Sequence, residues 1–108
     1  MAILVFKRGA STVFHSDQID SESNGTQDVE ELAVKKYRTK FGHGSSEPSV
    51  YAVDLDNSVK KLTKSNSKIS STTEYVCVAV DDVVQCYLDS GSLHSHLKSC
   101  LAVHRKSE

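Results

Sequence analysis

The sequence predicts an α+β fold in which a mixed β-sheet is crossed by one helix. Residues 75–80 are apolar at every position and rich in valine, which is typical of a strand buried on both faces. Residues 28–42 repeat apolar side chains at helical spacing, which gives a face that can pack on a sheet. We therefore expect residues 75–80 to lie in the middle of the sheet, with the helix across it.

A second apolar run opens the chain. Residues 2–7 are mostly apolar, and Gly9 then lets the chain turn back. Residues 12–15 are mixed in polarity, which favours an outer strand paired with this run. The polar segment 16–27 is expected to be a mobile loop.

The crossing helix has clear end signals. Asp28 is suited to cap its start and stands in the capping-box relation to Glu31, while Gly42 is suited to end it. Its apolar face is formed by residues four apart in sequence: Val29, Ala33, Tyr37 and Phe41. The later turns carry cations, which the negative end of the helix dipole favours.

Two strands are expected before the central one. Residues 49–55 predict a strand with Tyr51, Val53 and Leu55 on one face, and residues 59–62 predict a short strand.

The rest of the chain is a connection and a C-terminal segment. Residues 63–73 are rich in Ser, Thr, Asn and Lys and are expected to form a connection or exposed loop. Residues 83–88 fit a strand and a helix equally well. Residues 93–104 repeat leucine at every fourth position, which predicts a terminal helix capped by Ser92.

The order of these elements favours one topology. The first and last strands are the most evenly apolar, so they should lie side by side at the centre, in parallel, joined by a long crossover. With the helix across one face, this arrangement is the ubiquitin-like β-grasp. We expect a single domain over residues 1–108, with a β-grasp core over 2–80 and a C-terminal extension with a helix over 81–108.

A resemblance points the same way. Residues 50–56 (VYAVDLD), then residues 59–62 and 73–79 (TEYVCVA), resemble the closing half of doublecortin-type domains, which belong to the ubiquitin-like β-grasp superfamily. The resemblance falls within residues 50–79 and implies the β-grasp fold. Doublecortin-type domains bind tubulin and usually carry a basic surface and a glycine after the third strand, where this chain has Asp56 and Asn57.

Composition narrows the function classes. The formal net charge is −1, so no attraction of the whole protein to nucleic acid is expected. No segment approaches the roughly 20 apolar residues that span a bilayer, so we expect no membrane partner. Cys77, Cys86 and Cys100 lack C-x-x-C spacing and no export signal is evident, which predicts reduced thiols in an intracellular, cytoplasmic protein.

The candidate chemical sites are incomplete. His96, Cys100 and His104 recur every four residues, a spacing that zinc uses, but a fourth ligand has no obvious source. No activating motif surrounds Cys86 or Cys100, and no phosphate loop or nucleophile elbow occurs. We therefore expect neither enzyme activity nor a metal or cofactor.

The basic residues suggest a binding function. They cluster on the helix and after the third strand: Lys35, Lys36, Arg38, Lys60, Lys61 and Lys64. We expect a non-enzymatic protein–protein interaction or adaptor module, which binds a protein partner, acidic in character, through a sheet edge or this basic face. The oligomeric state stays open.

An RNA-binding domain is the alternative. Residues 28–106 alone would form an α-β-β-β-α domain whose basic positions meet RNA phosphates. In that case residues 83–88 pair antiparallel with residues 75–80. If residues 2–7 pair there instead, the β-grasp is favoured.

Overall fold

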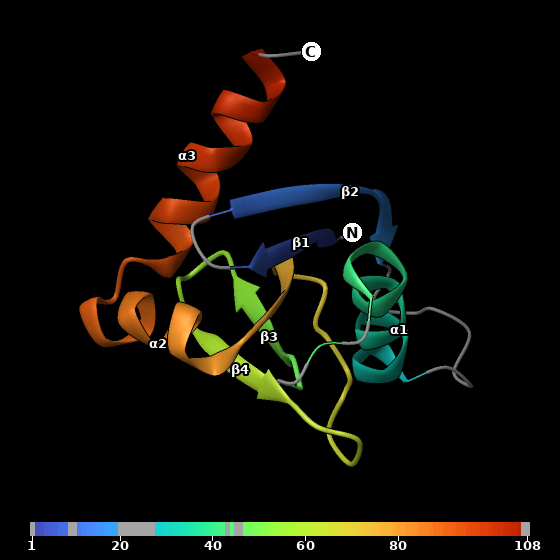
Figure 1. Ribbon diagram of the computed structural model, residues 1–108. Helices are drawn as coiled ribbons and strands as arrows, with labels where there is room; N and C mark the ends of the chain where they lie inside the picture. Colours follow the sequence, from blue (N-terminus) through green and yellow to red (C-terminus); the bar gives the residue numbers. More distant parts are fainter. Residues whose placement is uncertain (1, 9–10, 20–27, 43, 45–46, 107–108) are drawn as a thin grey trace.

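The computed structural model describes residues 2–8, 11–19, 28–42, 44 and 47–106. In chain order its elements are β1 (Ala2–Arg8), β2 (Ser11–Ile19), α1 (Val29–Phe41), β3 (Ser49–Asp54), β4 (Val59–Leu62), β5 (Thr73–Ala79), α2 (Asp81–Ser90) and α3 (Leu93–Lys106). The strands form one mixed sheet, with α1 on one face and α2 and α3 on the other (Figure 1). The predicted α+β class is confirmed.

The centre of the sheet is a parallel pair of strands. The strand order is β2-β1-β5-β3-β4. β1 and β5 run parallel, with Ile3 opposite Tyr75 and Lys7 opposite Ala79, and every other neighbouring pair is antiparallel. The predicted central position of residues 75–80 and their pairing with residues 2–7 are therefore confirmed for residues 75–79 and 3–7, while Val80 lies beyond β5 and caps the start of α2.

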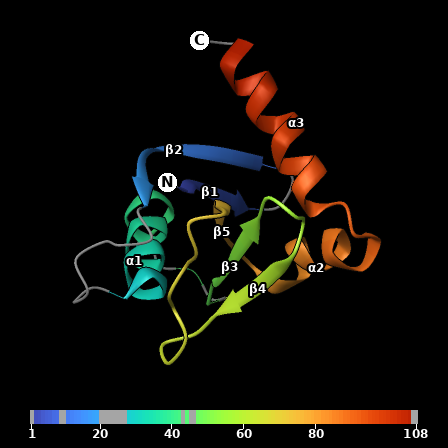
Figure 2. The ribbon, with the colours of Figure 1, turned by 180° about the vertical axis from the view of Figure 1, so that it is seen from behind.

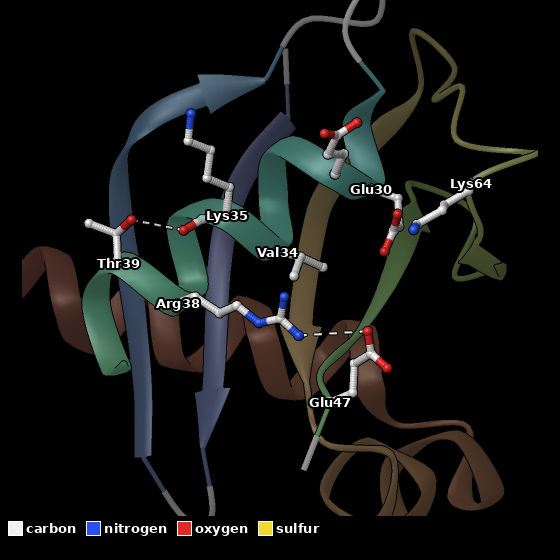
Figure 3. A pocket seen from close by; sticks show the side chains of 8 residues that line it. Glu30, Val34, Lys35, Arg38, Thr39, Glu47 and Lys64 are labelled. Atoms are coloured by element: carbon white, nitrogen blue, oxygen red, sulfur yellow. Dashed lines mark hydrogen bonds and ion pairs between the residues drawn. The ribbon is translucent and has the colours of Figure 1, made fainter. Parts of the chain in front are cut away.

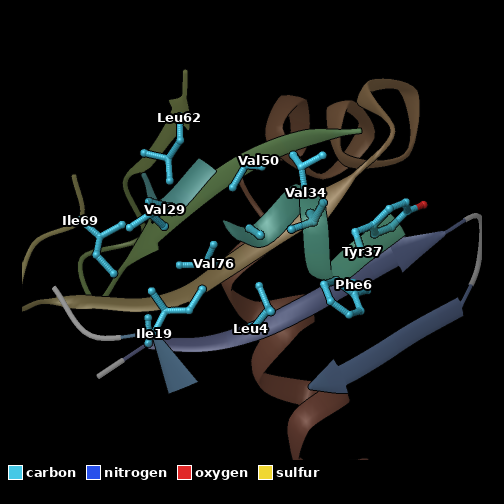
Figure 4. Close-up of a cluster of buried hydrophobic side chains, with 14 residues drawn as sticks. Leu4, Phe6, Ile19, Val29, Val34, Tyr37, Val50, Leu62, Ile69 and Val76 are labelled. Carbon is cyan, nitrogen blue, oxygen red and sulfur yellow. The ribbon is translucent and has the colours of Figure 1, made fainter. Parts of the chain in front are cut away.

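One hydrophobic core lies between α1 and the sheet (Figure 4). Leu4 and Phe6 of β1 and Val76 and Val78 of β5 are fully buried there. The Phe6 ring and the Tyr37 ring of α1 form an edge-to-face pair, with the ring centroids 5.6 Å apart. The predicted apolar face of α1 is confirmed by this packing.

A second core lies on the opposite face. Val5 and Cys77 from the central strands pack with Val84 of α2 and with Leu93 and Leu97 of α3. Burial on both faces explains why β1 and β5 are apolar in consecutive positions rather than in alternate ones. Seen from behind, α3 crosses the end of the sheet beside β2 and its last turns project beyond it (Figure 2).

The ambiguous segment 83–88 belongs to helix α2. Val84 is buried against the sheet, whereas Asp82, Gln85 and Cys86 are exposed, which is a helical period. Gly91 ends the helix in the left-handed conformation, at φ 68°. The antiparallel pairing that the RNA-binding alternative required is replaced by this helix.

The ends of α1 match the sequence with one difference. Asp28 is the N-cap, but its carboxylate accepts the backbone N–H of Glu30, at 3.2 Å, rather than that of Glu31. Gly42 has φ 76° and donates its N–H to the carbonyl of Arg38 at 2.7 Å. At α3, Ser92 precedes the helix, and its carbonyl accepts the N–H of His96.

Two boundaries differ from the expectation. The loop predicted over 16–27 is wrong for residues 16–19, which extend β2 to Ile19, a core residue that the polar neighbours concealed. Residues 20–27 and the turn at Gly9 lie outside the described residues. Leu55 does not share the buried face of β3 and is 62% exposed, because the chain turns after Asp54.

The second core predicts a contrast between two residues of α3. Leu97→Ala should lower the free energy of unfolding by about 2–5 kcal/mol, because it opens a cavity under the helix. Val103→Ala, at a position that is 68% exposed, should change it by less than about 0.5 kcal/mol. Urea unfolding of both variants measures the contrast, and equal effects would show that α3 does not pack as described.

Candidate functional site

A groove of about 560 Å³ lies between α1 and the connection that follows β4 (Figure 3). Val34 is its main apolar residue, and three cations and three carboxylates surround it: Lys35, Arg38, Lys64, Glu30, Glu31 and Glu47. Glu30, Val34 and Arg38 are four residues apart, so α1 presents them on one stripe. The groove is therefore charged but balanced.

One ion pair crosses the groove. Arg38 Nη2 lies 3.6 Å from Glu47 Oε1, and the Glu47 side chain is 83% exposed. In Figure 3 the Arg38 side chain extends across the groove towards Glu47. Exposed pairs of this length contribute little to stability, so a ligand carboxylate can replace Glu47 at Arg38 at small cost.

Glu30 is the least satisfied group in the groove. Its Oε2 atom is buried and has no hydrogen-bond partner among the described residues. Burial raises the pKa of the Glu30 carboxyl, and Asp28 raises it further, while Lys64 opposes the shift. This oxygen can therefore accept a hydrogen bond from a ligand N–H once the Glu30 side chain turns into the groove.

The six basic residues predicted for binding are only partly brought together. Lys35, Arg38 and Lys64 line the groove. Lys60 is opposite Ala52, so it shares the sheet face that α1 covers, whereas Lys61 is opposite Tyr51 and belongs to the other face.

Lys36 is half-buried on α1 and does not line the groove. The carboxylates that accompany the cations were not anticipated as site residues, although the spacing of Glu30 and Arg38 on one helical stripe was a usable signal.

A second polar cluster lies inside the core under α3. Lys7, at the end of β1, is only 1% exposed. Its ammonium donates to Thr12 Oγ1 and to His96 Nε2, each at 2.9 Å, and stands 5.2 Å from the ring centroid of Tyr87. His96 stacks on the same ring at 4.1 Å. Four elements, β1, β2, α2 and α3, therefore meet around one cation.

This contact determines the state of His96. An ammonium has only donors, so His96 Nε2 must be an acceptor, and the imidazole is neutral with its proton on Nδ1. Burial lowers the pKa of His96, and the charge of Lys7 lowers it further. From the sequence, Lys7 counts within the apolar run 2–7 and is assigned no role, because its partner His96 is distant in sequence.

His96, Cys100 and His104, which lie four residues apart on α3, contact different partners. His96 faces Lys7, and Cys100 Sγ lies 3.6 Å from His96 Nε2. His104 stacks on Phe14, with the ring centroids 5.3 Å apart. Among the described residues, no group of three His, Cys, Asp or Glu side chains is arranged to hold a metal ion.

Comparisons with protein-family models, with curated proteins and with solved structures each found no match. Within the described part of the chain, no helix has both the length and the apolar character that crossing a membrane requires. The three cysteines are free.

The His96 contact predicts acid sensitivity. An unfolded histidine binds a proton near pH 6.5, whereas His96 in the folded chain binds one only at lower pH. Unfolding therefore takes up a proton in this window, so the free energy of unfolding should fall as the pH drops below about 6.5.

Urea unfolding at a series of pH values measures this effect. His96→Gln should reduce the loss of stability on acidification, and Ser99→Gln, an exposed change on the same helix, should leave it intact. If His96→Gln retains the full pH dependence, His96 is not the group responsible.

Proposed function

We propose that this chain is a non-enzymatic intracellular protein-binding module of the ubiquitin-like β-grasp type, and that it binds an acidic segment of its partner in the groove beside α1. The sheet order, the parallel central pair and the helix across one face support the fold assignment. The free state of all three cysteines is compatible with a reducing compartment.

The binding proposal rests on two polar side chains of the groove whose ionic and hydrogen-bonding capacity is not fully used within the chain. Among the residues that the structure describes, the Arg38 side chain forms an ion pair with the exposed Glu47 alone, and the buried Oε2 atom of Glu30 has no hydrogen-bond partner. A ligand carboxylate would pair with Arg38 and Lys64, while a neighbouring backbone N–H of the ligand would donate to Glu30. Val34 offers apolar contact between these groups.

The sheet edges are less suited to binding. β4 has four residues, two of which are lysines, and this combination protects an edge against strand addition. β2 is longer, but its register with β1 is irregular between Ile3 and Val5, which interrupts a regular ladder. We therefore favour the groove over either edge.

A peptide library displayed on beads tests the proposal. The chain should enrich peptides that contain Asp or Glu. Arg38→Glu with Lys64→Glu should weaken their binding at least about tenfold, because both contacts to the ligand carboxylate become repulsive. The matched control is Lys98→Glu with Lys106→Glu, which changes the net charge equally on exposed positions of α3.

The outcomes separate the candidates. Equal loss in both double variants would show that net charge rather than the groove governs binding. Lack of enrichment, together with groove-dependent binding of a fluorescent single-stranded RNA, would favour the RNA-binding alternative. Circular dichroism of each variant establishes that the fold is retained.

A further inference from the structure

The polar cluster under α3 contains a thiol. Cys100 Sγ lies 3.6 Å from His96 Nε2 and 3.9 Å from Thr12 Oγ1. These are the same two atoms that Lys7 Nζ contacts at 2.9 Å. Lys7 and Cys100 therefore share both of their partners, and the buried cation and the sulfur border one small polar centre.

This centre contains a cation without a matching anion. Among the side chains that the structure describes, no carboxylate forms an ion pair with Lys7. A buried ammonium is costly unless it is compensated, so a negative charge that develops beside it is stabilised. The sulfur of Cys100 is the group placed to carry that charge, and it is half-buried rather than enclosed.

We propose that Cys100 is a site of oxidative modification by hydroperoxides, activated by His96 and Lys7. The thiolate is the reactive form of a cysteine, and it is favoured by an adjacent base and cation. His96 is the base, because its Nε2 atom carries no proton and lies 3.6 Å from the sulfur, and its lone pair becomes available when Lys7 turns its N–H from Nε2 to the sulfur. Lys7 is the cation.

The reaction with hydrogen peroxide balances within this set of groups. The thiol proton of Cys100 moves to His96 Nε2, which frees one N–H of Lys7 for the thiolate. The sulfur attacks one peroxide oxygen, the O–O bond breaks, and the leaving oxygen takes the proton from His96 to form water. Cys100 becomes a sulfenic acid, losing two electrons that the peroxide gains.

The other two cysteines provide internal comparisons. Cys86 on α2 is exposed, and among the described residues its sulfur has one hydrogen-bond partner, the backbone carbonyl of Asp82 at 3.7 Å. Cys77 is fully buried, and burial raises its pKa to about 12. Accessibility alone would make Cys86 the most reactive thiol, whereas activation by the polar centre makes Cys100 the most reactive.

The test measures the rates of the thiols in one sample. The folded chain is treated with dilute hydrogen peroxide, the sulfenic acid is trapped with dimedone, and tandem mass spectrometry quantifies each site over time. Cys100 should be labelled at least about tenfold faster than Cys86, a threshold set below the roughly 10²–10⁴-fold that a positioned general base typically contributes. In urea the two rates should become similar.

Variants assign the effect to its groups. His96→Gln should slow labelling of Cys100 and leave labelling of Cys86 unchanged, and Lys7→Met should do the same where it folds. The ratio of the Cys100 and Cys86 labelling rates is measured in the unmodified chain, so this test remains valid even if Lys7→Met does not fold. Labelling of Cys86 as fast as Cys100, a ratio that persists in urea, or an unchanged Cys100 rate in His96→Gln would each overturn the proposal.

Discussion

The parallel pairing of β1 with β5 is the contact on which the rest of the structure depends. These two strands are the most distant in sequence among the five, yet they lie side by side at the centre of the sheet. Both of their faces are buried, one by α1 and the other by α2 and α3. Both central strands therefore contribute side chains to each of the two cores in which the helices pack.

This central position also explains the polar cluster. Strand alternation places Lys7 on the same face as Val5, and Lys7 is opposite Ala79, so its side chain enters the second core. A small neighbour at that place leaves room for a long side chain, while Thr12, Tyr87 and His96 surround its charge. The strand pairing thus converts a residue that ends an apolar run into a buried cation.

The groove beside α1 lies on the face of the sheet opposite to α2 and α3. α1 uses one side for the core and presents Glu30 and Arg38 next to the β4–β5 connection, with the largely buried Val34 at the border between the core and the groove. Its charges come from three separate parts of the chain, since Glu31 belongs to the helix, Glu47 precedes β3 and Lys64 belongs to that connection. A groove with equal numbers of cations and carboxylates is better suited to a ligand whose own charges complement both than to a ligand that is merely anionic.

The sequence by itself determined the sheet centre, the helix α1 with its caps, and the terminal helix, because long apolar runs and helical periods are local properties of the chain. It did not determine whether residues 83–88 were strand or helix, since a six-residue run satisfies both periods. The sequence also suggested one basic surface for six residues that the fold divides between the two faces of the sheet. It did not reveal that Lys7, His96 and Cys100 lie close together. Tertiary structure decided these points, because strand register and helix docking determine which distant side chains share one space.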